Sequence, residues 1–157
     1  MTLSASEIDA LDQKHLARAA QLGLGCPASE GSFSVGAVLT DSDGIEISTG
    51  YTREFGDSWH AEHVALEKAA RDGINPMGGW MYSSLEPCGN RLSGNLPCTQ
   101  RIIDAKLSRV VYAEKEPPNF VTGVGHDVLR EQGMKVIQLD GFEEVFRQAN
   151  KHLLEKL

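Results

Sequence analysis

Two kinds of hydrophobic pattern alternate along the chain. Apolar residues that recur every three or four positions predict amphipathic helices, and short runs rich in β-branched and aromatic residues predict strands. The expected helices cover residues 5–22, 60–71, 99–105, 126–132 and 142–157. The expected strands cover residues 34–40, 45–51, 80–84, 109–113 and 134–139.

Local signals mark several of these boundaries. Ser4 and Glu7 have capping-box spacing at the start of the first helix, and Gly23 with Gly25 is expected to end it. A turn that ends in Gly44 separates the first two strands, which is typical of a β-hairpin. The first two strands are therefore expected to pair with each other.

The order of the elements predicts an α/β fold. Strands that alternate with helices form a sheet with helices packed on its faces, and the initial hairpin adds an antiparallel pair to it. We expect a three-layer α/β/α arrangement around a mixed five-stranded sheet. The length of 157 residues favours one compact domain that covers residues 1–157.

Composition narrows the function classes. The net charge is −7 and there is no basic run, which argues against a nucleic-acid partner and favours a small substrate. No stretch is long and apolar enough to cross a bilayer, so no membrane association is expected. The first residues have neither a basic region nor an apolar core of a signal peptide, and the expected location is the cytoplasm.

The chain contains three cysteines, Cys26, Cys88 and Cys98. An odd number in a chain expected to be cytoplasmic argues against a disulfide framework and favours metal binding or catalysis. For Cys26 the simpler interpretation is a buried thiol that behaves as a small hydrophobic residue.

His60 and Glu62 lie at the expected start of a helix. Residues two apart on a helix do not share a face, so a common site must lie beyond the helix end, where the first turn converges. Taken alone, this pair is weak evidence, because most such pairs are a solvated histidine and an exposed glutamate.

Each of the other two cysteines follows a proline, and nine residues separate Cys88 from Cys98. Thiolates and imidazole are ligands that favour zinc, and three protein ligands with one open position are typical of catalytic zinc. One alternative is a structural zinc site completed by Cys26 or His63. Another is that the cysteines are inert and bind no metal.

The combination is more specific than its parts. A His-x-Glu pair followed by Pro-Cys and a second cysteine is the signature of zinc deaminases, in which the glutamate carries protons and does not bind the metal. The order and the prolines are present here, although the cysteines are farther apart than in the short form of that signature. Zn²⁺ held by His60, Cys88 and Cys98, with Glu62 as the acid–base group, is the resulting hypothesis.

The chain also resembles a known family. The matching residues are Val35-Gly36-Ala37-Val38, His60-Ala61-Glu62, Leu85-Glu86-Pro87-Cys88, Glu116-Pro117, Gly123-Val124-Gly125 and Gly133-Met134-Lys135-Val136. Together they resemble the pyrimidine deaminase of riboflavin biosynthesis over nearly the whole chain. The loop Arg91-Leu92-Ser93-Gly94-Asn95-Leu96-Pro97 is similar to the fungal version, which acts on the reduced, ribityl form of the intermediate.

The resemblance implies a cytidine-deaminase-like fold and a phosphorylated pyrimidine substrate. The implied reaction is hydrolytic removal of the 2-amino group from 2,5-diamino-6-ribitylamino-4(3H)-pyrimidinone 5′-phosphate. Three places depart from the bacterial pattern, and all are substrate-facing in the family. Gly31-Ser32-Phe33 replaces Pro-Asn-Pro, Asn90 replaces a loop histidine, and Glu116-Pro117-Pro118-Asn119 replaces Asp-Pro-Asn-Pro.

Candidate substrate contacts follow from the loop between the two cysteines. Arg91 is expected to bind the phosphate through its guanidinium, with exposed surface charge as the alternative. Ser93 and Asn95 are expected to contact ring or ribityl groups, and Asn90 and Arg53 complete the set of candidates. Trp59 is more often a core residue than a stacking platform for a pyrimidine.

Two rival functions remain open at this point. One is deamination of cytidine, deoxycytidylate or a nucleoside antibiotic by the same zinc chemistry. The other is a binding module whose zinc is structural. We also expect a homo-oligomer, most simply a dimer, because deaminases of this type often associate.

Overall fold

The computed structural model describes residues 2–89, 91, 94–120 and 123–155. Its helices are α1 (Ala5–Leu24), α2 (Ala61–Arg71), α3 (Cys98–Asp104), α4 (Gly125–Glu131), α5 (Glu143–Ala149) and α6 (Lys151–Leu154). Its strands are β1 (Gly36–Thr40), β2 (Glu46–Tyr51), β3 (Trp80–Leu85), β4 (Arg109–Glu114) and β5 (Lys135–Gln138). Within those described residues, no helix has the length and apolar character needed to cross a membrane.

The five strands form one mixed sheet in the order β2-β1-β3-β4-β5. Strand β1 runs antiparallel to both β2 and β3, whereas β3, β4 and β5 are parallel. The hairpin and the mixed five-stranded sheet expected from the sequence are therefore confirmed. The predicted homodimer stays a prediction.

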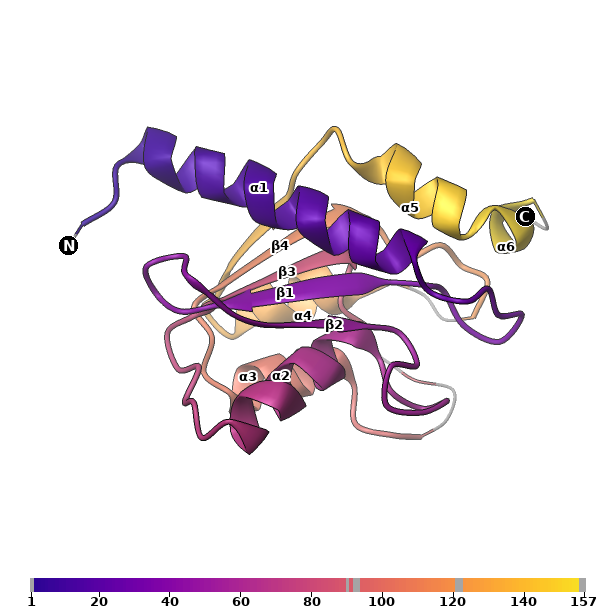
Figure 1. Cartoon of the computed structure of the whole chain (residues 1–157), viewed down its shortest axis with the longest axis horizontal. Helices are drawn as coiled ribbons and strands as arrows, with labels where there is room; N and C mark the ends of the chain where they lie inside the picture. The colour runs from indigo at the N-terminus through magenta and orange to yellow at the C-terminus, as the bar shows by residue number, and fades with distance from the viewer. Residues whose placement is uncertain (1, 90, 92–93, 121–122, 156–157) are drawn as a thin grey trace.

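Helices cover both faces of this sheet (Figure 1). Helices α1 and α5 lie on one face, and α2 and α3 lie on the other. Successive strand residues alternate between the two sides: Val38, Tyr82 and Val111 pack beneath α1, whereas Leu39 and Met81 belong to the core on the other side. Because every one of these residues is buried, the central strands contact helices through both faces.

Helix α1 continues two residues beyond the expected end at residue 22. Gly23 stays helical, because its lack of a side chain lets the helix lie directly on β1: a Cβ there would be 2.9 Å from the backbone nitrogen of Gly36. The N-terminal prediction is confirmed, since Ser4 and Glu7 form both hydrogen bonds of the capping box. Gly25, not Gly23, is the C-terminal cap.

The prediction of one continuous C-terminal helix over 142–157 is wrong. The chain leaves the helical conformation at Asn150, where φ is −121° and ψ is 21°, and α6 begins after it. The fully buried Asn150 side chain accepts a 2.6 Å hydrogen bond from the Ser34 backbone N–H and donates to the Ser34 carbonyl at 2.9 Å. This side chain thus satisfies the backbone just before β1, a long-range contact that helical periodicity does not reveal.

A buried ion pair joins α1 to the sheet. The Asp12 carboxylate accepts hydrogen bonds from both terminal nitrogens of Arg109 on β4, each at 2.5 Å, and from the Tyr82 hydroxyl on β3 at 2.6 Å. Asp12 is 5% exposed and Arg109 is 7% exposed. Removing one member of such a pair leaves an uncompensated buried charge.

We predict that Asp12→Ala lowers the free energy of unfolding by about 3–5 kcal/mol, the cost typical of a broken buried ion pair. Urea denaturation at a fixed zinc concentration measures this change. The control is Glu46→Ala, which breaks the exposed ion pair between Glu46 and Arg18 and is expected to cost less than about 1 kcal/mol. Equal effects of the two substitutions would contradict the assigned importance of the Asp12 pair.

Candidate active site

The start of α2 brings His60 and Glu62 to one site. His60 is the N-cap residue and Glu62 lies in the first turn, so both side chains serve the space beyond the helix end, as expected. The helix can begin there because Gly50 on β2 has no side chain: a Cβ at that position would lie 2.2 Å from the Ala61 carbonyl oxygen. The glycine therefore allows the first turn of α2 to lie directly on the sheet.

The two cysteines reach the same place from other elements. Strand β3 ends at Leu85 and leads through Glu86 and Pro87 to Cys88, and Cys98 is the first residue of α3. The Thr99 backbone N–H donates to the Cys88 carbonyl at 3.2 Å. This bond holds the start of α3 against the end of the β3 loop.

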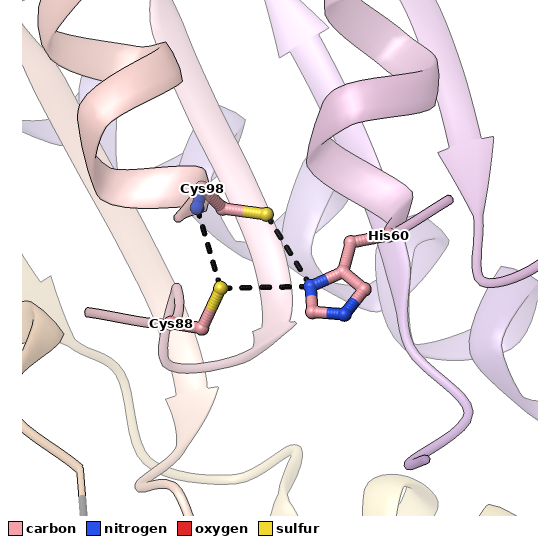
Figure 2. Close-up of side chains that lie close together, drawn as sticks. All are labelled: His60, Cys88 and Cys98. Carbon is pink, nitrogen blue, oxygen red and sulfur yellow. Dashed lines mark hydrogen bonds between the residues drawn. The ribbon is translucent and has the colours of Figure 1, made fainter. Parts of the chain in front are cut away.

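Figure 2 shows that His60, Cys88 and Cys98 point toward a common centre. His60 Nδ1 lies 3.5 Å from each of the two sulfur atoms, and the three potential ligand atoms all lie within 4.8 Å of one another. Tetrahedral zinc with ordinary bond lengths would place nitrogen and sulfur about 3.6 Å apart. The spacing and the donor types therefore both fit a zinc ion.

A fourth protein ligand is absent from this group of residues in the part of the chain that the structure describes. Cys26 lies elsewhere, with its sulfur 3.5 Å from the Thr52 carbonyl oxygen. His63 stacks on Trp59 with a centroid distance of 4.0 Å. The two residues considered as a fourth ligand for structural zinc are thus engaged in other contacts.

The surroundings of Cys88 favour its thiolate form. The pKa of Cys88 is lowered to about 4, first by the hydrogen bond with the Cys98 side chain and then by hydrogen bonding and charge from His60, against the effect of burial. The Cys98 backbone N–H also donates to the Cys88 sulfur at 3.2 Å. Thiolate is the form in which cysteine binds metals.

Glu62 is buried beside this cluster, with an exposed fraction of 4%. Burial, with the negative charge of Cys88 as the next cause, raises the pKa of its carboxyl to about 7. A carboxyl with a pKa near neutrality can both accept and release a proton.

A cavity of about 450 Å³ opens onto His60, Glu62 and Cys88. Its size is within the range of sites for small organic ligands. Its lining contains both apolar and charged side chains. The apolar ones include Phe33, Val35, Leu85 and Phe120, and the charged ones include Arg53, Asp57, Glu86, Arg91 and Glu116. The site can therefore enclose a flat ring while offering polar contacts at its edges.

The structure places only some of the candidate substrate contacts at the cavity. Arg91 and Arg53 both line the cavity, whereas the cavity lining does not include Asn95, which is exposed. Asn90 and Ser93 lie outside the described residues. Arg91 donates to the Ser58 carbonyl at 2.6 Å and more weakly to that of Leu96 at 3.4 Å.

Besides lining the cavity, Arg53 forms hydrogen bonds that the sequence did not indicate. Its guanidinium donates to the Ser32 hydroxyl at 2.6 Å, to the Ser34 hydroxyl at 3.1 Å and to the Pro27 carbonyl. It therefore holds the segment 27–34, part of which lines the cavity. Its backbone φ of 68° is in the left-handed region, which is uncommon for an arginine.

Glu86 and Phe120 are among the cavity residues that were not candidates from the sequence, whereas Glu116 belongs to a segment that was expected to face the substrate. Glu86 directly precedes the Pro87-Cys88 pair and follows an expected strand, so a carboxylate at a strand end was an available signal. Phe120 had no such signal, because its place on the cavity depends on how the segment after β4 folds back.

Comparisons with known proteins agree with this site. A model of the cytidine and deoxycytidylate deaminase zinc-binding region matches residues 10–114 of the chain. The chain belongs to this family. The match, together with the His and Cys donor set, identifies zinc as the metal cofactor of the site.

Relatives within the family come from riboflavin biosynthesis. The chain is 40% identical over 123 residues to the diaminohydroxyphosphoribosylamino-pyrimidine deaminase of Schizosaccharomyces pombe, a match that covers 76% of this chain and 30% of that protein. It is 35% identical over 118 residues to the riboflavin biosynthesis protein RibD of Aquifex aeolicus, covering 75% of this chain and 31% of the relative. The chain thus spans about a third of the length of these relatives.

Solved structures confirm the cytidine-deaminase-like fold. The Rib2 deaminase of Aspergillus oryzae in complex with DARIPP has a TM-score of 0.80 and 30% identity, with coverage of 92% of this chain and 94% of that chain. A dCMP deaminase from the cyanophage S-TIM5 has a TM-score of 0.63 over 88% of this chain and 100% of that chain. At 19% identity, the latter similarity concerns the fold alone.

Proposed function

We propose that this chain is a zinc-dependent pyrimidine deaminase of riboflavin biosynthesis. The proposed reaction is hydrolytic removal of the 2-amino group from 2,5-diamino-6-ribitylamino-4(3H)-pyrimidinone 5′-phosphate. The main support is the arrangement of His60, Cys88, Cys98 and Glu62 around one cavity. The similarity to the Rib2 deaminase, which covers 92% of this chain, favours this substrate class over cytidine or deoxycytidylate.

In this proposal His60, Cys88 and Cys98 hold the zinc ion, and Glu62 does not bind it. Three ligands leave one coordination position for solvent, as catalytic zinc sites do. When bound, zinc supplies a water molecule whose pKa is lowered to roughly 7. The same three residues would leave a structural site incomplete, which argues against a binding module.

Glu62 moves the protons. Its buried carboxylate accepts a proton from the attacking water and delivers it to the ring nitrogen beside the reacting carbon. It then accepts the proton of the new hydroxyl group and passes it to the amine, so that the C–N bond breaks, the carbonyl forms and ammonia leaves. A pKa near 7 suits both transfers, because neither form of the carboxyl is strongly favoured at neutral pH. The surrounding burial also keeps bulk water from competing for these protons.

The remaining cavity walls suit the rest of the substrate. Phe33 and Phe120 offer apolar surfaces to the pyrimidine ring. Arg91 and Arg53 bring positive charge to the cavity, and guanidinium groups bind phosphate with two parallel hydrogen bonds. Both arginines already donate to backbone carbonyls, so their positions are fixed before substrate arrives. We assign the phosphate to this arginine side of the cavity.

The ligand assignment predicts the metal content of variants. His60→Ala and Cys98→Ala should each lower bound zinc well below one ion per chain, because a three-ligand site has no spare donor. Metal analysis after gel filtration measures this. Cys26→Ala is the matched control, because it removes a cysteine outside the cluster and should keep the full zinc content. Full zinc occupancy in His60→Ala or Cys98→Ala would contradict the assignment.

Replacing the proton carrier should affect turnover while leaving the metal bound. Glu62→Gln is expected to keep zinc and to lower kcat by about 10²–10⁴-fold, the contribution typical of a positioned acid–base group. Glu67→Gln on the same helix is the control, since Glu67 pairs with Arg71 at 3.2 Å on the surface. Turnover of Glu62→Gln equal to that of the control would remove Glu62 from this role.

Substrate choice is tested by ammonia release from two compounds. The ribityl pyrimidinone phosphate is expected to be deaminated with a kcat/KM at least about 100-fold above that of deoxycytidylate, because polar groups built to bind one ring stay unpaired with another. Comparable or higher activity on deoxycytidylate would shift the assignment to a nucleotide deaminase that uses the same zinc site.

A further inference from the structure

Glu86 is a buried carboxylate that the proposed chemistry does not use. It is 2% exposed and lies between the end of β3 and the Cys88 turn. One of its oxygens accepts a hydrogen bond from the Glu116 backbone N–H at 3.0 Å, and the other accepts from the His126 backbone N–H at 2.9 Å. Of the residues that the structure describes, no lysine or arginine forms an ion pair with it.

The two donors lie near opposite ends of one connection. Glu116 comes shortly after β4, and His126 lies in the first turn of α4. Between these two donors, the structure describes residues 116–120 and 123–126. Of these residues, Glu116 and Phe120 line the cavity. A single carboxylate thus fixes both ends of the segment that forms this wall.

The segment also packs tightly on Glu86 and the Cys88 turn. A Cβ on Gly123 would lie 2.7 Å from a carboxylate oxygen of Glu86, and a Cβ on Gly125 would lie 1.8 Å from the Pro87 carbonyl oxygen. The His126 ring forms a 2.7 Å hydrogen bond with the buried Tyr112 hydroxyl of β4. Residues 123–126 therefore lie directly against Glu86 and the Cys88 turn.

We propose that Glu86 is a positioning residue, whose carboxylate links the Cys88 turn to the cavity wall formed by Glu116 and Phe120. It does not touch the reacting atoms. It accepts hydrogen bonds from two partly buried backbone N–H groups, those of Glu116 and His126, and so determines where the wall lies relative to His60 and Cys88. The effect of this link on substrate binding rests on the proposed deaminase activity, whereas the link itself does not.

Glu86→Gln tests the link with almost no change in shape. The amide keeps one acceptor oxygen, but its NH₂ group faces a backbone N–H, so one of the two hydrogen bonds is lost. We expect KM for the ribityl pyrimidinone phosphate to rise about 10-fold or more, the effect of losing one hydrogen bond to a charged group. We expect kcat to change by less than about 3-fold and zinc to stay bound, because the metal cluster and Glu62 are intact.

Glu114→Gln is the matched control. Glu114 ends β4 just before the same segment, but its carboxylate accepts from Arg147 on α5 at 3.0 Å and does not line the cavity. It should leave KM, kcat and zinc content unchanged. If Glu86→Gln also leaves KM unchanged, or lowers kcat and zinc content together, the positioning role is overturned.

Amide hydrogen exchange of the zinc-loaded protein gives a readout that does not depend on activity. Its first measurement uses the unsubstituted chain and therefore does not depend on the folding of a variant. In the unsubstituted chain, the Glu116 and His126 amides should exchange at least about 100-fold more slowly than exposed loop amides, because both donate to the buried Glu86 carboxylate. In Glu86→Gln, exchange should accelerate at one or both of these amides and stay unchanged in β1 and β3. Unprotected Glu116 and His126 amides in the unsubstituted chain would overturn the proposal, even if the deaminase assignment itself fails.

Discussion

The architecture of this site depends on the close approach of three backbone segments. The first turn of α2, the turn after β3 and the start of α3 supply the three potential ligand atoms, which all lie within 4.8 Å of one another. The first two of these segments also lie against glycines of β2 and α4, where no side chain would fit. A Cβ on Gly50 would meet the Ala61 carbonyl oxygen at 2.2 Å, and one on Gly125 would meet the Pro87 carbonyl oxygen at 1.8 Å. This proximity brings His60 Nδ1 within 3.5 Å of two sulfur atoms that come from different elements.

The three glutamates that line the cavity have different environments, and the differences suit different tasks. Glu86 is satisfied by two backbone N–H groups and therefore acts as a fixed structural acceptor. Burial raises the pKa of Glu62 to about 7 and that of Glu116 to about 8, in both cases with the Cys88 charge as the next contribution. Like charges this close favour a neutral form of at least one group, and a neutral carboxyl can donate a hydrogen bond to a ligand.

Much of this arrangement was predictable from the sequence, because it rests on local patterns. Periodicity and capping residues predicted the element order, and the mixed sheet followed from the hairpin and the alternating helices. The motif around His60, Glu62 and Cys88 predicted the family, which the comparisons confirm. The geometric argument that residues two apart must converge beyond a helix end is confirmed by His60 as the N-cap of α2.

What escaped prediction depends on contacts between distant segments. Asn150 interrupts the last helix because its side chain pairs with Ser34, which is 116 residues away in the sequence. Phe120 joins the cavity because the chain after β4 lies against Glu86, whose carboxylate accepts a hydrogen bond from the Glu116 backbone N–H. Arg53 was expected as a substrate contact, and its hydrogen bonds to Ser32 and Pro27 could not be inferred from neighbouring residues. Local patterns do not carry this information.

The central claim is that one imidazole and two thiolates hold a zinc ion that keeps one position for solvent. Zinc K-edge X-ray absorption on the loaded protein tests it most directly. We predict two sulfur neighbours at about 2.3 Å and two nitrogen or oxygen neighbours at about 2.0–2.1 Å. One of these two lighter neighbours is solvent and should be exchangeable with an added anion. A shell with three or four sulfurs, or with none, would contradict it, as would four protein ligands and no exchangeable one.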